Sequence, residues 1–194
     1  RVMRVLARLV QQFDVVAVQE IRSEAQDVIP RFLKIVNHDG ANYDYVISER
    51  LGRTVSKEQY AFLFNADRIA VDRRSATSLH QFQSRLHRPP FVAKFRTLVS
   101  TSNAPFTFTL VNLHTDPDET RKELNALDDV IDHVREADPH EDDVLLLGDL
   151  NVDRKHFGEL GQIPHLKSVP ENQTTNMRRT EQYDHITFDA LSTT

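Results

Sequence analysis

Residues 145–153, LLLGDLNVD, are the stretch of sequence that decides the fold. Its leading leucines predict a buried strand over 144–147, which a glycine ends. Asp149, Asn151 and Asp153 then place a polar side chain at every second position. Side chains at alternate positions of an extended segment point the same way. The stretch therefore predicts a core strand that delivers oxygen-bearing groups to one rim of a sheet.

Two further predicted strands end in side chains of catalytic type. The apolar strand 15–18 leads into Glu20, and strand 106–113 leads into His114. Carboxylate and carboxamide oxygens suit a hard cation such as Mg²⁺, and histidine suits proton transfer. Three such strand ends at one rim would form a metal and phosphate site. The alternatives are a solvated charge for Glu20 and a structural histidine for His114.

A calcium loop is the rival interpretation of the alternating Asp-x-Asn-x-Asp pattern. An EF-hand loop has glycine at its sixth position and glutamate at its twelfth. Arg154 and Leu160 occupy those positions here, so the pattern fits such a loop poorly. A simple turn after a strand stays open as an alternative. We expect Asp153 to give local support rather than to take part in catalysis.

The composition indicates one globular domain over 1–194. The chain has 39% hydrophobic and 27% charged residues, which is ordinary for a soluble fold. The lack of cysteine excludes disulfides, thiolate nucleophiles and zinc–thiolate sites. No apolar run approaches the ~18 residues that span a bilayer, so we expect no membrane insertion. A net charge of -5 argues against a simple nucleic-acid binder but not against a metal-dependent nuclease.

The alternation of patterns predicts an α/β (α+β) fold, a sandwich of two sheets with outer helices. Periodicity predicts helices over 2–12, from Ser23 to about 39, and over 115–136. Pro30 lies inside the second of these, so the alternatives there are a kink or a later helix start. Residues 156–182 read as irregular. The expected strands are 15–18, 43–48, 60–64, 69–73, 91–97, 106–113, 144–147 and 183–188.

Four short motifs in order carry a resemblance to a known family: Gln19-Glu20, Leu113-His114, Gly148-Asp149-Leu150-Asn151 and Tyr183-Asp184-His185. They resemble the endonuclease/exonuclease/phosphatase superfamily. The flanking stretches FDVVAVQEIR (13–22) and LVNLHTDPDETRKELNALDDV (110–130) are most similar to its deoxyribonuclease I branch. The resemblance runs from about residue 8 to 188. It implies a deoxyribonuclease I-like two-sheet sandwich and metal-dependent hydrolysis of DNA phosphodiesters with weak sequence preference.

The resemblance also implies roles for the acidic groups. Glu20 would hold the catalytic Mg²⁺, for which Mn²⁺ or Ca²⁺ could substitute. Asp149 would position or activate the attacking water, or contact the metal. Glu58 would pair with His114, and the pair would act as a general acid or stabilise the phosphate. Asp184 would orient a second catalytic histidine.

The resemblance assigns the substrate contacts to a different set of side chains. Asn151 would donate a hydrogen bond to the scissile phosphate. Arg22 and Arg88 resemble arginines that contact the groove or the phosphates of DNA, with solvated surface charge as the alternative. Arg53 and Lys57 would add positive field, and contacts of this kind read the backbone rather than the sequence.

Departures from the family pattern lead to further expectations. The family has a strand with an asparagine before the first helix and a C-terminal Ser-Asp-His motif. We expect both to be missing from 1–194, so that the second catalytic histidine is absent and His185 is no substitute. Ser56 replaces a DNA-stacking tyrosine, which weakens the case for duplex DNA. Residues 171–180 match the family's calcium loop weakly.

Two other functions stay open on the sequence. One is a superfamily phosphatase or phosphodiesterase that acts on a lipid or sugar phosphate. The other is a catalytically inactive binding domain. We expect a monomer, and the sequence leaves the compartment undecided.

Overall fold

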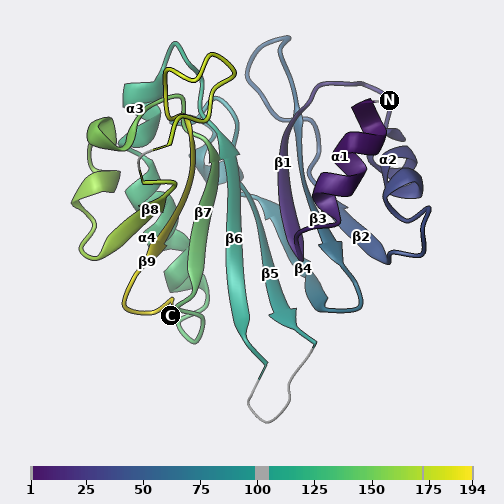
Figure 1. Cartoon of the computed structure of the whole chain (residues 1–194). Coiled ribbons are helices and arrows are strands. Elements are labelled where there is room, and N and C mark those ends of the chain that lie inside the picture. The colour runs from purple at the N-terminus through teal and green to yellow at the C-terminus, as the bar shows by residue number, and fades with distance from the viewer. Residues whose placement is uncertain (1, 99–104, 172, 194) are drawn as a thin grey trace.

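The chain folds into two β-sheets that face each other, with helices on the outside, in a computed structural model that describes residues 2–98, 105–171 and 173–193 (Figure 1). The smaller sheet has three antiparallel strands in the order β1-β3-β2. These are β1 Val15–Ile21, β2 Tyr43–Ile47 and β3 Gln59–Asn65.

The larger sheet has six strands in the order β4-β5-β6-β7-β9-β8. Neighbouring strands are antiparallel except β6 and β7, which run parallel. The strands are β4 Ile69–Ser78, β5 Phe91–Thr97, β6 Thr107–His114, β7 Val144–Asp149, β8 Leu166–Val169 and β9 Asp184–Asp189.

Two pairs of helices complete four layers, as Figure 1 shows. The pair α1 Val2–Val10 and α2 Val28–Val36 packs on the smaller sheet. The pair α3 Thr120–Leu124 and α4 Leu127–Ala137 packs on the larger sheet. Short 3-10 turns lie at η1 His80–Phe82, η2 Arg154–His156 and η3 Leu160–Gln162. The predicted two-sheet sandwich with outer helices is confirmed.

Strand β3 shows why the layers stack in this order. Alternate residues of a strand face opposite sides. Phe62 and Phe64 face the other sheet, where they meet Phe95 edge to face. Ala61 and Leu63 face the other way and pack with the apolar side of α2. All of these side chains are buried, so β3 is the central strand of one sheet and contributes to two cores.

Some element boundaries differ from those that the sequence predicts. The helix expected over 115–136 is two helices, because the chain breaks at Asn125 and Ala126, where Arg85 donates to the Asn125 carbonyl at 2.6 Å. The second helix begins at Val28 rather than near Ser23.

Of the two alternatives for Pro30, a kink or a later helix start, the structure shows the later start, whereas the expectation of an irregular stretch over 156–182 was wrong. Pro30 lies in the first turn of α2, where a backbone N–H has no partner within the helix, so it fits there without removing an intrahelical bond. The stretch 156–182 is not wholly irregular, because β8 pairs with β9 at the edge of the larger sheet. Only Ser168 of β8 is buried, so its sequence carries no apolar pattern.

A buried amide joins the two sheets near the site. Asn112 of β6 has no exposed surface. Its Nδ2 donates to the carbonyls of Val18 in β1 (3.3 Å) and Ala61 in β3 (3.2 Å). Its Oδ1 accepts a 2.6 Å hydrogen bond from Gln19 Nε2. A buried amide is tolerated because its donors and its acceptor are paired, and the pairing fixes β6 against the smaller sheet.

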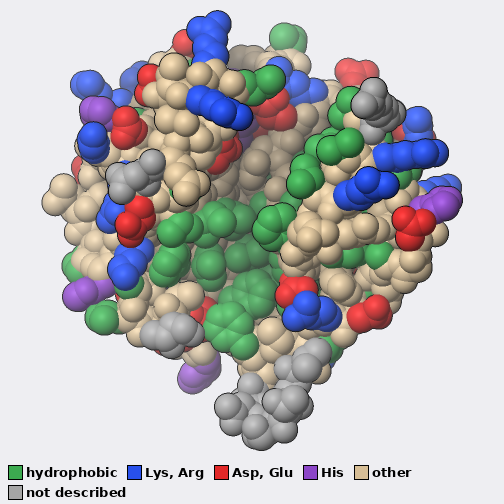
Figure 2. All heavy atoms as spheres, in the orientation of Figure 1, with side chains coloured by type: hydrophobic (Ala, Val, Ile, Leu, Met, Phe, Trp, Pro, Cys, Tyr) green, Lys and Arg blue, Asp and Glu red, His purple; other side chains and the backbone are tan. Residues whose placement is uncertain are grey.

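An apolar hollow of about 510 Å³ runs beside β1. It lies between Val15, Val16 and Ala17 of β1 and Leu147 and Ile186 of the larger sheet. Figure 2 shows it as a continuous hydrophobic surface at the centre of this face. Within the described residues, β1 pairs with β3 on one side and has no strand on the other. None of the helices in the described ranges is long and apolar enough to cross a membrane.

Gly148 allows the parallel strands β6 and β7 to approach at their carboxyl ends. It pairs with Leu113, and its φ is 151°. A Cβ at this position would lie 1.8 Å from the carbonyl oxygen of Leu113. No side chain can replace the glycine without separating the strands that carry His114 and Asp149.

We expect Gly148→Ala to lower the free energy of unfolding by about 3 kcal/mol or more, because the strand pair must separate. Urea unfolding measures the change. Gly40→Ala is the matched control, since Gly40 also has a positive φ (88°) but no neighbouring atom within 4 Å of the added Cβ. The control should cost about 1 kcal/mol. Equal losses in the two variants would contradict the steric explanation.

Candidate active site

Strand pairing brings three of the predicted residues together. Because β6 and β7 are parallel, their carboxyl ends lie at the same edge, and His114 is the partner of Asp149. Asp184, the first residue of antiparallel β9, is the partner of Asp149 on its other side. The three polar side chains therefore come from adjacent positions on three neighbouring strands.

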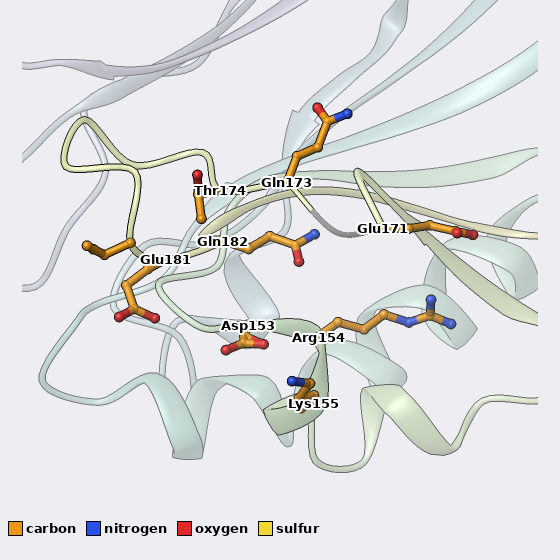
Figure 3. Close-up of a pocket in the computed structure, with 9 residues that line it drawn as sticks. Asp153, Arg154, Lys155, Glu171, Gln173, Thr174, Glu181 and Gln182 are labelled. Carbon is orange, nitrogen blue, oxygen red and sulfur yellow. The ribbon is translucent and has the colours of Figure 1, made fainter.

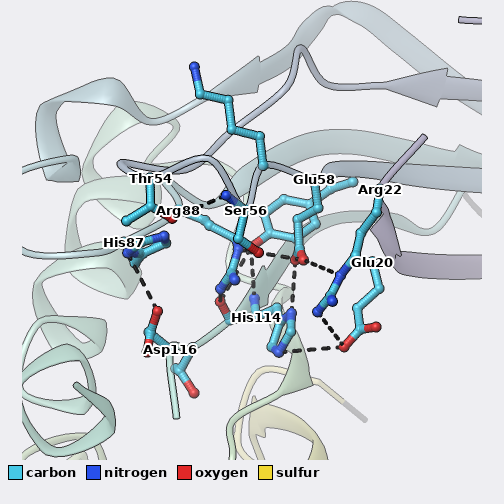
Figure 4. A network of polar contacts seen from close by, with 12 residues as sticks. Glu20, Arg22, Thr54, Ser56, Glu58, His87, Arg88, His114 and Asp116 are labelled. Carbon is cyan, nitrogen blue, oxygen red and sulfur yellow. Dashed lines mark hydrogen bonds and ion pairs between the residues drawn. The ribbon is translucent and has the colours of Figure 1, made fainter. Parts of the chain in front are cut away.

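Glu58 and His114 form the buried centre of the site (Figure 4). His114 Nδ1 lies 2.8 Å from Glu58 Oε1, and the two side chains are 5% and 1% exposed. Reciprocal backbone hydrogen bonds to Leu51 hold Glu58 in place just before β3. The backbone N–H of His114 donates to the Tyr60 hydroxyl at 3.0 Å. Both members of the pair are therefore fixed before any ligand binds.

The two predicted arginines have different surroundings. Arg22 is more than half exposed, with Nη2 3.5 Å from Glu20 Oε1 and Nε 4.0 Å from Glu58 Oε2. Both interpretations from the sequence placed Arg88 at the surface, but its side chain is only 4% exposed. Its Nε is 3.5 Å from Glu58 Oε2, and its Nη1 donates to the His114 carbonyl at 3.3 Å. Arg88 offsets the buried charge of Glu58 from inside the protein.

Glu20 is aimed into the site by an irregular piece of backbone. The register of β1 against β3 shifts between Val18 and Ile21, and Glu20 has a φ of 58°. A left-handed conformation is unfavourable for a side chain other than glycine, and such bulges redirect side chains beside functional sites. The carboxylate is half-exposed, and Oε1 lies 4.0 Å from His114 Nε2 (Figure 4).

The loop after β7 is held by hydrogen bonds of its own polar groups. The backbone N–H of Asn151 donates to Asp149 Oδ1 at 2.9 Å. Asn151 has a φ of 52°, a conformation that asparagine adopts more readily than most residues. Its Nδ2 donates to the Thr115 carbonyl at 2.9 Å. An amide has two N–H donors, so one remains for a ligand.

His185 belongs to the core. Its ring is buried, with Nδ1 2.9 Å from Ser168 Oγ and Nε2 2.8 Å from the Val152 carbonyl. Asp184 is exposed and, among the residues that the structure describes, hydrogen-bonds to no histidine. The expectation that His185 is no substitute agrees with this geometry, and the role expected for Asp184 stays a prediction.

The environment raises the pKa of both proton-transfer candidates. Burial lowers the pKa of His114, but the hydrogen bond and charge of Glu58, together with the charge of Asp149, outweigh it and leave that pKa above its ordinary value of 6.5. Burial raises the pKa of Asp149 above 3.8, although the hydrogen bond from the Asn151 N–H opposes the shift. His114 therefore holds its proton to a higher pH than a free histidine does, and Asp149 becomes protonated at a higher pH than a free aspartate.

Sequence reasoning missed several residues that shape the site. Tyr60 supports His114 from a strand whose aromatic side chains otherwise read as core. Thr115 supports the loop after β7 through its backbone, with its N–H donating to the Asp149 carbonyl at 3.0 Å. Asn112 joins the sheets beneath the Glu20 bulge. These contacts join residues that are 34 or more positions apart in the chain, so no local sequence pattern predicts them.

The acidic groups fit a cation that is bound by few protein ligands. Glu20 and Asp149 supply carboxylate oxygens and Asn151 a carboxamide, the donors that Mg²⁺ and Mn²⁺ accept. In the described ranges, three acidic groups close enough to share one ion are found only at 141–143, at the other end of β7. Mg²⁺ commonly keeps several waters and uses one or two carboxylates plus substrate phosphate, so an open site of this kind suits it.

An open polar cavity of about 520 Å³ lies beside these loops rather than at the Glu58–His114 pair (Figure 3). Asp153 and Arg154 line one side, and Gln173 and Gln182 are among the residues on the other. The cavity involves part of the stretch 171–180 that matches the calcium loop weakly, of which residue 172 lies outside the described residues. Asp153 lines this cavity, in accord with a supporting rather than a central position.

Comparison with known proteins identifies the class. Residues 1–185 match the model of the Endonuclease/Exonuclease/phosphatase family, and the chain belongs to this family. It is 34% identical to deoxyribonuclease-1 of Bos taurus over 157 residues, which cover 76% of this chain and 52% of that protein. It is 32% identical to deoxyribonuclease gamma of Rattus norvegicus over 161 residues, which cover 77% and 49%. The chain thus spans about half the length of these relatives.

Solved structures share the fold at lower identity. A mannosyl-6-phosphatase of Bacteroides thetaiotaomicron superposes with a TM-score of 0.62 at 16% identity, covering 95% of this chain and 75% of that one. The human Nocturnin catalytic domain gives 0.60 at 13% identity, covering 97% and 73%. The sandwich is therefore shared by proteins that bear quite different names.

We expect Glu58→Gln to lower the pKa of His114 below 6.5, because the charge of Glu58 is lost while the burial that opposes protonation remains. NMR titration of the ring measures it. In the wild type the raised pKa stabilises the fold below the unfolded-state pKa, and this contribution disappears as pH rises through the folded-state pKa. The variant should lack that dependence. An unchanged His114 pKa would contradict the assignment.

Proposed function

We propose that this chain forms the catalytic core of a divalent-metal-dependent endonuclease that hydrolyses DNA phosphodiesters with little sequence preference. The observation that carries the proposal is the buried Glu58–His114 pair beside the half-exposed Glu20 carboxylate. An ion pair with side chains 1% and 5% exposed is costly to bury, and its raised histidine pKa suits acid catalysis. The curated relatives named deoxyribonuclease support the choice of substrate.

In this proposal His114 acts on the leaving group. Glu58 accepts from Nδ1, so the ring presents Nε2 toward Glu20 and the open side of the site. The raised pKa means that the ring keeps its second proton to a higher pH than an ordinary histidine does. When the P–O bond to the leaving oxygen breaks, Nε2–H can donate its proton to that oxygen or stabilise the charge on the phosphate.

Asp149 and Asn151 act on the attacking side in the same proposal. Asp149 is partly buried, and its raised pKa makes it a better proton acceptor than a solvated aspartate. It orients a water for in-line attack on phosphorus and accepts a proton from it. The free N–H of Asn151 donates to a phosphate oxygen and stabilises the charge that develops there. Asp184, beside Asp149 in the sheet, adds negative charge at this edge.

A divalent cation held by Glu20, with Asp149 as the second candidate ligand, would neutralise charge on the phosphate when bound. Arg22 is the exposed arginine of the site and the proposed contact to the phosphate backbone. Arg88 is buried and takes no part in this contact. It supports the site by its charge beside Glu58 and by its hydrogen bond to the His114 carbonyl. Backbone contacts of this type carry no base information, which is why weak sequence preference is expected.

Nicking of supercoiled plasmid by the full-length protein tests the function. We expect Mg²⁺-dependent nicking that EDTA abolishes and that His114→Ala reduces about 100- to 10,000-fold, because proton transfer to the leaving group is lost. His38→Ala is the control, since this exposed histidine pairs with Asp39 at the end of α2.

The other outcomes of this assay separate the alternatives. Release of phosphate from a small phosphate ester without nicking would indicate a phosphatase. DNA binding without either reaction would indicate an inactive binding domain. Nicking that His114→Ala leaves unchanged would refute the assigned role of His114.

A bell-shaped pH dependence of kcat/KM follows from the two shifted groups. The rate should fall toward acid as Asp149, with a pKa above 3.8, becomes protonated. It should fall toward alkali as His114, with a pKa above 6.5, loses its proton. Glu58→Gln should move the alkaline limb to lower pH and leave the acid limb in place. A profile with no alkaline limb would show that His114 is not the acid.

A further inference from the structure

Two short segments carry the charged groups that surround the His114 ring, and the β-ladder between them is irregular. Glu20 and Arg22 lie at the end of β1, and Glu58 lies just before β3. Strand pairing becomes irregular at this point, since the register shifts after Val18 and ends with Ile21 opposite Gln59. Beyond the shift, the ladder joins the two segments only at Ile21 and Gln59, so a further contact is needed to fix the backbone on either side of that pair.

The side chain of Arg50 spans the two segments. Its Nη1 donates to the carbonyls of Arg22 (2.9 Å) and Ser23 (2.6 Å), just after β1. Its Nη2 donates to the carbonyl of Lys57 (3.1 Å), the residue before Glu58. One guanidinium therefore binds three backbone oxygens, two on one segment and one on the other.

The backbone around Arg50 makes this bridge rigid. Leu51, the next residue, exchanges hydrogen bonds with Glu58 at 2.8 and 3.0 Å. The guanidinium is planar and offers five N–H donors in fixed directions, so it can hold several acceptors at set positions. A lysine ammonium is a flexible point charge that lacks this geometry.

We propose that Arg50 is a positioning residue that fixes Glu20 and Arg22 relative to the Glu58–His114 pair. The inference rests on the proposed function, because it assigns Arg50 to the geometry of that site. Arg50 acts through the backbone and contacts neither substrate nor metal. The structure places Glu20 Oε1 4.0 Å from His114 Nε2, a separation that loosening of either segment would change.

Arg50→Ala and Arg50→Lys test the inference against Arg73→Ala. Arg73 is a matched control because its guanidinium also donates to a backbone carbonyl, that of Tyr45 at 3.1 Å, and pairs with Asp44 at the start of β2. Hydrogen exchange of the free protein over 20–24 and 52–58 reports on the two segments. Plasmid nicking with Mg²⁺ gives kcat and KM, and thermal unfolding shows whether each variant is folded.

Arg50→Ala should speed exchange in both segments and lower kcat about 10- to 100-fold, with KM within about twofold of wild type, because misplacement by an ångström costs rate more than binding. Arg50→Lys should restore part of the rate. Arg73→Ala should match wild type in exchange and kcat. Unchanged exchange in Arg50→Ala, or a kcat equal to that of Arg73→Ala, would overturn the inference.

Failure of the proposed function would give a different result. Wild-type protein would then show no nicking at all. Hydrogen exchange would still test whether Arg50 holds the two segments together. Faster exchange limited to the two segments would support the bridge, and wild-type exchange in Arg50→Ala would refute it.

Discussion

The parallel pairing of β6 and β7 is the constraint on which the site depends. Antiparallel neighbours place the end of one strand beside the start of the next, whereas a parallel pair brings two carboxyl ends to one edge. His114 and Asp149 meet for this reason, and β9 adds Asp184 at the same level. The close approach requires Gly148, because a side chain there would collide with Leu113. The positions of these polar side chains thus depend on the close backbone contact between Gly148 and Leu113.

The energetics of the site are dominated by charges that are kept from water. Glu58 and His114 lose hydration on burial, and their mutual hydrogen bond with the nearby Arg88 offsets part of that cost. Such an arrangement adds little net stability, but it holds the His114 ring in a fixed orientation with Nε2 on the side of Glu20. Glu20, by contrast, stays half-exposed, as its proposed role in binding a cation requires.

The sequence predicted the layers and the strand-end residues well, because both follow from local patterns. Alternating and continuous apolar runs located most strands, and LLLGDLNVD led directly to Asp149 and Asn151. The sequence did not reveal that Arg88 is buried, because an arginine followed by two prolines is a pattern that also occurs in surface loops. At the break in the helix over 115–136, the Asn125 carbonyl accepts from Arg85, a residue 40 positions away, and the sequence does not reveal a contact of that kind. The bridge formed by Arg50 likewise depends on tertiary contacts.

The apolar hollow beside β1 lies next to a strand edge that has no partner strand among the described residues. In the described part of the chain, the outer edge of β1 offers unpaired backbone donors and acceptors next to Val15, Val16 and Ala17. A bare strand edge with apolar neighbours is a template on which a further β-strand can pair. Further along the same strand, Glu20 faces the site. A β-strand added along this edge, whichever segment supplies it, would therefore cover the hollow and run toward the proposed site.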